Sequence, residues 1–433
     1  MTARERSPNR PHIYNSFSLT LPMILATMGS NKSVTTMNAI MTEVFTGLKP
    51  EKIRIYREDS NLLGESKKTL EKALSILGIR AEVEEKVVGE DLRTWKEVLS
   101  RDQVDVFDVT PGRKYMAIAG TYSHGNSVRY VYIKEEVEGY RIFGYIPFSR
   151  VKVLDVRSGE KVELDRLSTL DADPHSRLER DSLTALYNIL AIHGKVEVDE
   201  GASKDDREDY VELCKMRAGG IRFREEEEIR KFRGSLFIAD TNTYINIGPR
   251  LRDLVNSRKI NLLASKTVFD ELVGKVVSGS KDPKLWKFSL GVESYRDIHK
   301  IPFTKGGQSY GDRSLIEEIR NIKSNVQDQV ILLTGDRELS TKASTLGIKT
   351  IFLSQETQGH MDYGEYIYCL SRSGRGLRKP TISVDGKDVV EIRENPGTEL
   401  GITQVVTKDM RYNFAKVLEL LQEIMRRDQG TSS

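Results

Sequence analysis

Four acidic residues in the second half of the chain have the types and positions expected of a metal centre. Asp240 directly follows the apolar run Ser-Leu-Phe-Ile-Ala, and Asp336 directly follows Val-Ile-Leu-Leu-Thr-Gly. Both runs predict buried strands of a parallel sheet, so both carboxylates should emerge at the same carboxyl-end rim. Glu271 lies about one turn into a predicted helix, and Asp312 opens another. The sequence therefore allows four acids to converge.

Carboxylates gathered in this way repel one another and raise one another's pKa, so such a cluster requires a neutralising cation. Oxygen ligands without His or Cys suit Mg²⁺ or Mn²⁺, which keep several waters and serve phosphate chemistry. One or two such ions would activate a water and stabilise charge on a phosphodiester. Taken singly, Asp240 or Asp336 is more simply explained as a helix N-cap, because an Asp between a strand and a helix usually has that role.

The order of these motifs resembles the PIN family of metal-dependent ribonucleases, which includes the VapC toxins, across about residues 234–354. The matching motifs are Asp-Thr-Asn-Thr after a strand, Val-Phe-Asp-Glu-Leu on a helix, Gly-Asp before a helix, and Leu-Leu-Thr-Gly-Asp-Arg-Glu-Leu after a strand. The resemblance implies that the catalytic metal ligands are Asp240, Glu271, Asp312 and Asp336. It also implies that three flanking polar residues would hydrogen-bond the acids or a metal-bound water, namely Thr241, Asn242 and Thr334.

Two α/β cores must position the functional residues, and the first spans residues 16–150. Predicted strands cover residues 18–27, 52–57, 81–88 and 104–110, and predicted helices cover residues 34–45, 66–77 and 91–100. A helix between successive strands predicts right-handed crossovers and a doubly wound, Rossmann-like parallel sheet. Val128–Lys134 and Tyr140–Ile146 then predict an antiparallel hairpin appended to that sheet.

The second core, the PIN-like α/β domain with a parallel sheet, is expected over residues 234–360. Its predicted strands cover residues 235–239, 260–264, 329–334 and 349–353. Residues 151–233 predict a helical connector with one helix over residues 176–193. Residues 361–433 predict an extension that contains a hairpin turning at Asp385-Gly386 and an amphipathic helix over residues 408–426.

Two loops of the first core have the residue types that bind phosphate. Each precedes a helix N-terminus, where free amides and the helix dipole favour an anion. An equal alternative is that the glycines only form tight turns and the cations are solvated. No glycine-rich dinucleotide fingerprint or Walker lysine loop is present, so neither NAD nor ATP is supported. The candidate ligand-binding residues are Thr27, Met28, Gly29, Ser30, Asn31 and Ser33 in the first loop, and Thr110, Pro111, Gly112, Arg113, Lys114 and Met116 in the second.

Residues 16–147 resemble the CRISPR-associated Rossmann fold, or CARF, domain, with much of the connector as its extension. The matching features are the first loop, the segment Tyr56-Arg57-Glu58-Asp59-Ser60, and the element Thr-x-Gly-Arg-Lys-x-Met of the second loop. The resemblance implies a homodimer that binds a cyclic oligoadenylate, most often cyclic tetra-adenylate, across its twofold axis. Pro111 departs from the small residue expected there, which leaves the ring size and any ring cleavage open.

Composition and charge narrow the classes of protein. The 433 residues contain 67 Lys and Arg against 64 Asp and Glu, and this balance excludes a basic coat protein for nucleic acid. The two cysteines, Cys214 and Cys369, cannot make a disulfide framework or a four-ligand zinc site, so a reducing cytoplasm is expected. The apolar stretch over residues 19–28 is interrupted by Pro22 and is too short to span a bilayer, so no membrane insertion is expected.

One local basic patch stands out in the extension and would contact the phosphates of an RNA; a solvated loop is the equal alternative. It consists of Arg372, Arg375, Arg378 and Lys379.

Together these patterns predict a cytoplasmic, homodimeric effector of type III CRISPR antiviral defence, in which cyclic oligoadenylate regulates metal-dependent RNA cleavage. Two other classes stay open: a nucleotide-binding regulator with a silent PIN-like domain, and a ring nuclease that degrades the cyclic oligoadenylate. A free-standing toxin-like nuclease is a third.

Overall fold

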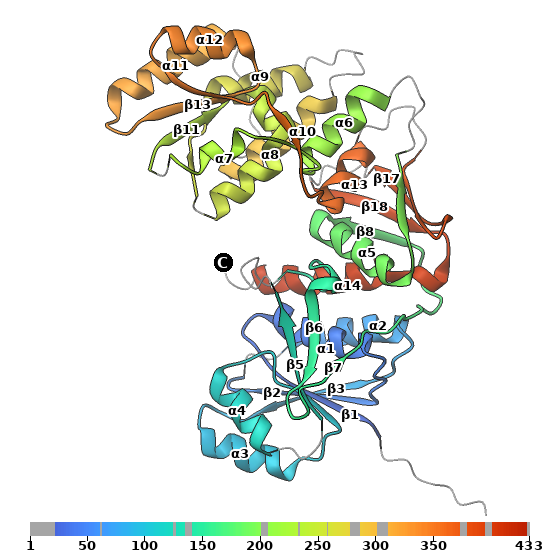
Figure 1. The fold of residues 1–433 in the computed structure, drawn as a ribbon. Coiled ribbons are helices and arrows are strands. Elements are labelled where there is room, and N and C mark those ends of the chain that lie inside the picture. Colours follow the sequence, from blue (N-terminus) through green and yellow to red (C-terminus); the bar gives the residue numbers. More distant parts are fainter. Residues whose placement is uncertain are drawn as a thin grey trace, which may run out of the picture.

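The computed structural model describes residues 22–60, 63–123, 127–134, 141–200, 207–232, 234–257, 259–277, 286–300, 311–372, 379–394 and 401–430. Figure 1 shows three bodies along the long axis of the molecule: a first core at the bottom, a middle domain, and a second core at the top. Within the described residues, no helix is long and apolar enough to cross a bilayer.

The first core is a seven-stranded sheet in the order β3-β2-β1-β4-β5-β6-β7. Its first five strands are parallel, and β6 and β7 are antiparallel to their neighbours. The parallel part has the Rossmann-like winding that the alternating pattern predicted. The strands are β1 Ile24–Met28, β2 Lys52–Arg57, β3 Glu82–Val87, β4 Val106–Asp108, β5 Ser127–Ile133, β6 Val151–Asp155 and β7 Lys161–Val162, and the helices are α1 Ser33–Phe45, α2 Ser66–Ile76, α3 Leu92–Arg101 and α4 Lys114–Ser123.

The hairpin predicted after β5 is wrong in its second strand. The antiparallel partner of β5 is β6, with Tyr130 opposite Leu154. Arg141 to Ile146 form turns instead, and Tyr140 lies outside the described residues. Burial explains the difference, because the Phe143 ring packs 5.0 Å from the ring of Phe45 on α1 rather than standing on an exposed sheet.

The middle domain contains a five-stranded antiparallel sheet that combines the predicted connector with the predicted extension. Its strand order is β8-β18-β17-β16-β9. The expectation of a purely helical connector is therefore wrong, because β8 and β9 find their partners about 200 residues later in the chain. The strands are β8 His175–Glu179, β9 Val196–Asp199, β16 Thr381–Val384, β17 Lys387–Glu394 and β18 Ile402–Thr407, and the helices are α5 Arg180–His193, α13 Tyr363–Arg372 and α14 Phe414–Gly430.

Two details of this domain follow from turn and cap chemistry. The predicted hairpin turn at Asp385-Gly386 is present, and both residues have positive φ, of 50° and 77°, as a two-residue hairpin loop of the right twist requires. The last helix begins at Phe414, later than predicted, because Asp409 caps a separate 3₁₀ turn over Met410–Tyr412. Helix α14 lies between the first core and the middle sheet, in contact with α1, α2 and β8 (Figure 1).

The second core has the four-stranded parallel sheet that the sequence predicted, in the order β12-β11-β13-β14. Strand β13 is buried along its whole length, which is typical of a parallel strand covered on both faces. A two-stranded ribbon of β10 and β15 lies between this core and the middle domain in sequence. The strands are β10 Ile221–Phe223, β11 Leu236–Ala239, β12 Asn261–Leu262, β13 Val330–Thr334, β14 Lys349–Phe352 and β15 Glu356–Gln358, and the helices are α6 Arg207–Arg217, α7 Glu226–Ile229, α8 Thr241–Asn256, α9 Lys266–Val277, α10 Trp286–His299, α11 Asp312–Asn325 and α12 Arg337–Thr345.

The two cysteines form one disulfide, which the sequence did not lead us to expect. Cys214 on α6 and Cys369 on α13 are 155 residues apart in the chain, and both are fully buried. The bond fastens α6 to the middle domain.

A buried group of charged side chains joins the middle domain to the second core beside this disulfide. Arg217 of α6 is fully buried and donates from Nε to Oε1 of Glu365, 3.0 Å away. Arg180 of α5 donates to Oε2 of Glu293 on α10 at 3.2 Å, and Arg372 approaches Oε1 of the same carboxylate at 3.1 Å. We refer to Arg180, Arg217, Arg372, Glu293 and Glu365 as the junction cluster.

Candidate functional site

Asp240 lies where β11 ends and α8 begins, and its carboxylate is held on both sides. The Thr243 amide donates to Oδ1 at 2.7 Å, and the Thr334 hydroxyl donates to Oδ2 at 2.5 Å. The residue is only 4% exposed. The pKa of Asp240 is raised to about 6, because burial and, to a smaller extent, the nearby charge of Asp336 raise it more than the hydrogen bonds from Thr243 and Thr334 lower it.

Asp336 occupies the equivalent position after β13. It caps α12, accepting hydrogen bonds at Oδ1 from the amides of Glu338 at 2.7 Å and Leu339 at 3.0 Å. Its own amide donates to Thr334 Oγ1 at 2.9 Å. Strands β11 and β13 are parallel neighbours, with Ala239 opposite Leu333, so their following residues meet at one rim. Thr334 therefore links the Asp240 carboxylate to the Asp336 amide, and both aspartates are helix N-caps, the simpler role that the sequence allowed for each.

Glu271 joins this rim from α9. The hydroxyl of Thr241 donates to Glu271 Oε2 at 2.8 Å. The first turn of α9 is fixed in turn by Glu318 of α11, whose carboxylate accepts from the Ser265 hydroxyl at 2.8 Å and from the Lys266 amide at 3.0 Å. Two hydrogen-bonded pairs therefore lie where β11 and β13 end: Asp240 with Thr334, whose hydroxyl oxygen also accepts from the Asp336 amide, and Glu271 with Thr241, the residue after Asp240. We call this group the acidic rim: Asp240, Glu271 and Asp336 with Thr241 and Thr334.

Asp312 opens α11 after Gly311, as predicted, but its carboxylate pairs with a cation. Lys342 Nζ of α12 lies 3.1 Å from Asp312 Oδ2. Asn242 is exposed and forms no hydrogen bond with a residue that the structure describes. Lys342 and Glu318 were missed by the sequence reasoning, because a contact between two helices leaves no spacing signal in the chain.

The carboxylates of the acidic rim are the ligand type that Mg²⁺ or Mn²⁺ would need. Across the described parts of the chain, no group of three or more His, Cys, Asp or Glu side chains is close enough to hold an ion. Mg²⁺ usually needs only one or two protein carboxylates, because waters and substrate phosphates complete its shell. Asp240 and Asp336 supply that donor type at one rim, and a cation there would offset the charge of Asp336 beside the buried Asp240 carboxylate.

The two glycine-containing loops of the first core meet at the carboxyl rim of its sheet. Strands β1 and β4 are parallel neighbours, with Thr27 opposite Asp108. Gly112 has φ of 87°, and a Cβ there would lie 3.1 Å from both Met28 Cβ and Met116 Sδ. The second loop therefore packs directly on the first, and the glycine is required for that approach.

The base of the second loop is rigid, whereas its cations are exposed. Thr110 Oγ1 donates to Asp108 Oδ2 at 3.1 Å and accepts from the Val131 amide at 2.8 Å. Burial and the neighbouring Glu43 raise the pKa of Asp108 well above its usual value. Arg113 pairs with Glu58 at 3.2 Å while remaining mostly exposed. The Lys114 side chain is exposed and has no ion-pair or hydrogen-bond partner among the described residues.

The basic patch predicted to contact RNA is altered by the fold. Arg372 is largely buried, because it pairs with Glu293 at 3.1 Å and with Glu394 at 3.5 Å, so it is not a free phosphate contact. Lys379 is exposed, 3.8 Å from a carboxylate oxygen of Glu391. Arg375 and Arg378 lie outside the described residues.

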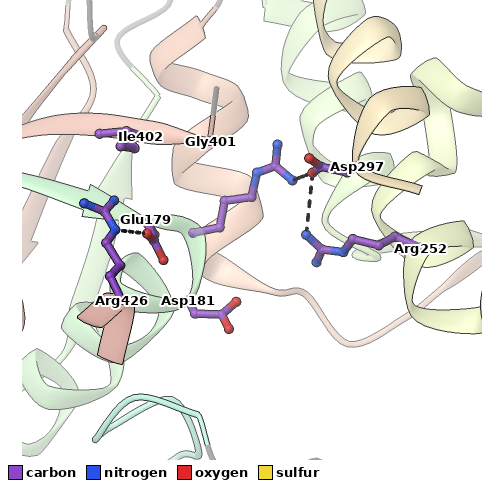
Figure 2. Close-up of a pocket in the computed structure, with 8 residues that line it drawn as sticks. Glu179, Asp181, Arg252, Asp297, Gly401, Ile402 and Arg426 are labelled. Atoms are coloured by element: carbon purple, nitrogen blue, oxygen red, sulfur yellow. Dashed lines mark hydrogen bonds and ion pairs between the residues drawn. The ribbon is translucent and has the colours of Figure 1, made fainter. Parts of the chain in front are cut away.

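A pocket of about 530 Å³ lies at the junction of the middle domain and the second core, away from both predicted sites. Asp297 of α10 pairs with two arginines, Arg180 at 3.2 Å and Arg252 at 4.0 Å. Figure 2 shows the pair of Asp297 and Arg252 on one side of the pocket. Arg426 of α14 pairs with Glu179 on the opposite wall at 2.6 Å. The pocket is lined by Glu179, Arg180, Asp181, Arg252, Asp297, Gly401, Ile402 and Arg426.

No protein-family model matches the chain, and neither does any curated protein sequence. Two solved structures are similar at low level. Can2 from Sulfobacillus thermosulfidooxidans, in complex with cyclic tetra-adenylate, is 10% identical over 80% of this chain and 97% of that one, with a TM-score of 0.27. Protein VC1899 from Vibrio cholerae is 11% identical over 76% and 94%, with a TM-score of 0.29. Similarities this low carry no argument about this chain.

The class of the protein is therefore described from its fold and its two rims alone. It is a mixed α/β protein with two parallel sheets, a Rossmann-like one with a glycine-containing, partly basic rim and a second one with an acidic rim. An antiparallel middle domain connects the two.

Proposed function

We propose that the protein is a CARF–PIN effector of CRISPR defence, which cleaves RNA at the acidic rim and is regulated by a cyclic oligoadenylate bound at the loops of the first core. One observation carries the proposal. Thr334 joins Asp240 and Asp336 at the ends of neighbouring parallel strands, and Thr241 joins Glu271 to the same rim. The position of these residues at one edge of the sheet supports the proposal that Asp240, Glu271 and Asp336 act together, as the PIN resemblance implies.

A bound Mg²⁺ or Mn²⁺ would supply an activated water and charge stabilisation for phosphodiester hydrolysis. In the proposal Asp240 and Asp336 hold the ion. Thr334 and Thr243 fix the direction of the Asp240 carboxylate. Glu271, oriented by Thr241, faces the water or the substrate phosphate. Asp312 contributes only after its ion pair with Lys342 is broken.

The nucleotide half of the proposal rests on the two loops of the first core. Their contact at Gly112 brings two helix N-termini to one rim, where backbone amides favour phosphate. Arg113 and Lys114 add exposed cations beside them. The proposal includes cyclic tetra-adenylate as the ligand and a homodimer as the active form, as the CARF resemblance implies.

The cleavage half is tested with labelled single-stranded RNA in Mn²⁺ or Mg²⁺, with and without cyclic tetra-adenylate. Asp240→Asn should abolish cleavage, because it removes the charge that holds the metal. Asp328→Asn is the matched control, since Asp328 is an exposed aspartate just before β13, at the opposite end of the strand from Asp336. Equal cleavage by wild type and Asp240→Asn would reject the metal site.

The binding half is tested by titrating the protein with cyclic tetra-adenylate. Lys114→Ala should weaken binding, whereas Lys72→Ala, an exposed lysine on α2 outside both loops, should not. Nucleotide binding without any RNA cleavage would favour the second candidate, a regulator with a silent second core. The Asp312–Lys342 ion pair is the observation that supports that candidate. Following the nucleotide in the same samples reports ring cleavage.

A further inference from the structure

A groove of about 440 Å³ runs between α11 and α12, next to the acidic rim. Helix α11 leads into the start of β13, and α12 follows its end, so the groove begins at the rim and continues down the side of the core. Asp312 and Lys342 stand at its upper end. The groove is lined by Asp312, Arg313, Ile316, Glu317, Arg320, Lys342 and Leu346.

Three cations edge this groove, and none is buried in a fixed interaction. Arg313 is 94% exposed and, among the described residues, pairs with Glu317 alone, one turn away, at 3.2 Å. Lys342 is half-exposed between Asp312 and Glu338. Arg320 is exposed and has no ion pair or hydrogen bond with any residue in the described part of the chain. Exposed ion pairs of this kind are weak, so the cations remain available to an anionic ligand.

The spacing of these groups fits a polymer better than a small anion. Arg313 and Arg320 lie on one face of α11, seven residues or roughly 10.5 Å apart along the helix axis. Between them lie two apolar side chains, Ile316, which is mostly buried, and Leu346, which is 50% exposed. Glu317 adds one exposed carboxylate to the same groove. A line of cations beside apolar side chains accommodates a strand with phosphates on one side and bases on the other.

We propose that this groove binds the phosphodiester backbone of single-stranded RNA and leads it to the acidic rim. The inference rests on the proposed function, because it names the path of that substrate. Carboxylates at the rim repel phosphates, so a nuclease with this rim needs cations close by to hold the strand. The groove also replaces the patch around Arg372, whose guanidinium is occupied by Glu293 and Glu394.

A strand in the groove has a consequence for Asp312. A phosphate that contacts Lys342 competes with the Asp312 carboxylate for the ammonium group. Substrate binding then releases Asp312 from its ion pair, which accounts for a predicted metal ligand that is otherwise paired with a lysine. For this reason Lys342 is a poor test residue, since its removal deletes a cation and frees an acid at once.

The clean test is the double variant Arg313→Ala/Arg320→Ala. Its control is Arg80→Ala/Arg93→Ala in the first core, because Arg93 matches Arg313 in exposure and in its pairing with a glutamate four residues later, and Arg80 is exposed like Arg320. All four positions are on the surface, and thermal melting checks that both variants fold. Both pairs are introduced into Asp240→Asn protein, so that RNA is bound without turnover.

The measurement is the fluorescence anisotropy of labelled single-stranded RNA at several salt concentrations. Loss of two phosphate contacts should weaken binding roughly tenfold at low salt and reduce the slope of log affinity against log salt by about 1.4. The control should match the parent protein. Equal affinity and slope for the groove variant and its control would overturn the groove. Cleavage by Asp240→Asn itself would instead reject the proposed function, and the binding comparison would then be made in the presence of a chelator.

Discussion

The carboxylate of Asp240 is buried at a cost that its hydrogen bonds do not fully offset. Thr243 and Thr334 both donate to it, yet its pKa is raised to about 6. A raised pKa means that the folded state favours the protonated acid. The contribution of protonated Asp240 to the free energy of unfolding is fully present below the pKa of an aspartate in the unfolded chain, near 3.8. It is lost as the pH rises through the folded-state pKa of about 6.

Asp240→Asn should therefore stabilise the protein at neutral and higher pH, in the presence of a chelator. The gain should be on the order of 3 kcal/mol at pH 8 and should fall towards zero near pH 4. Chemical denaturation of both proteins at the two pH values measures it. A stability difference that is the same at pH 4.5 and pH 8 would contradict the buried, ionisable state of Asp240.

Metal addition extends the same argument. A cation held by Asp240 and Asp336 should raise the melting temperature of the wild type, because a ligand that binds only the folded state stabilises it. Mn²⁺ at millimolar concentration should produce this shift in the wild type and in Asp328→Asn, and not in Asp240→Asn. Stabilisation of all three proteins to the same extent would place the ion elsewhere.

At the scale of single residues, the sequence predicted that Asp240 and Asp336 lie at one edge of the sheet, but it did not predict the hydrogen bonds and ion pairs that hold the acids there. Asp240 and Asp336 follow apolar runs that only parallel strands explain, so their shared rim was predictable. The pairing of Asp312 with Lys342 was not, because the two residues belong to different helices whose packing decides the contact. The bridging position of Thr334 likewise became visible only when both strands were in place.

Among the contacts between elements, we expect the junction cluster to be the most sensitive to the loss of one charge. Glu293 is almost fully buried, accepts hydrogen bonds from Arg180 at 3.2 Å and from the Tyr368 hydroxyl at 2.6 Å, and forms an ion pair with Arg372 at 3.1 Å. Neutralising Glu293 leaves Arg180 and Arg372 with fewer counter-ions, so buried positive charge is less fully compensated. Glu293→Gln should consequently lower the free energy of unfolding by about 3–5 kcal/mol.

Asp297 provides the matched comparison for this prediction. It lies one turn further along α10 and pairs with the same Arg180 at 3.2 Å, but it is more exposed. Asp297→Asn should lower the free energy of unfolding by at most about 1 kcal/mol, because exposed ion pairs contribute little. Urea denaturation of both variants distinguishes burial from mere pairing. Similar losses for the two would refute the special status of the buried carboxylate.

The disulfide makes an independent prediction about α6 and α13. Closing a loop of 155 residues restricts the unfolded chain, and the chain-entropy model gives a stabilisation of about 4–5 kcal/mol for loops of this size. Cys214→Ser/Cys369→Ser should lose stability of that order relative to the oxidised wild type. Thiol titration of the denatured, unreduced wild type should find no free thiol. Two free thiols would contradict the bond.

Elements of the two cores were predictable, whereas those of the middle domain were not. Strands such as β13 are apolar along their whole length, since a parallel sheet covers both of their faces. Strand β8, with sequence His-Ser-Arg-Leu-Glu, is short and half polar, and its partner β18 lies more than 200 residues later. No local pattern records such a pairing, so the strand was read as part of a helical connector.

On the scale of the whole molecule, a continuous series of packed elements connects the two rims. Phe45 of α1 packs against Phe414 of α14, with ring centroids 6.2 Å apart. Helix α14 lies against β8, and the adjoining α5 reaches α10 through Arg180. His299 of α10 hydrogen-bonds the Tyr244 hydroxyl, 2.7 Å away, on α8 one turn after Asp240. Figure 1 shows this succession from bottom to top.

Packing alone does not make the rims interdependent, because a nucleotide changes the nuclease only if it binds one state of it more tightly. Thermodynamic linkage turns this into a measurement. If cyclic tetra-adenylate raises the affinity for RNA by some factor, RNA must raise the affinity for the nucleotide by the same factor. Both titrations can be made on Asp240→Asn protein, in which the RNA is expected to stay uncleaved.

We expect the two factors to agree and to exceed about fivefold, the lower end of ordinary allosteric coupling. We also expect Asp297→Asn, combined with Asp240→Asn, to reduce both factors equally while leaving each separate affinity unchanged. Asp297 touches neither rim and pairs with Arg180 across the junction between the middle domain and the second core. Factors of one in both directions would show that the first core does not regulate the acidic rim. If the coupling factors are the same with and without Asp297, the coupling between the two rims depends on other contacts.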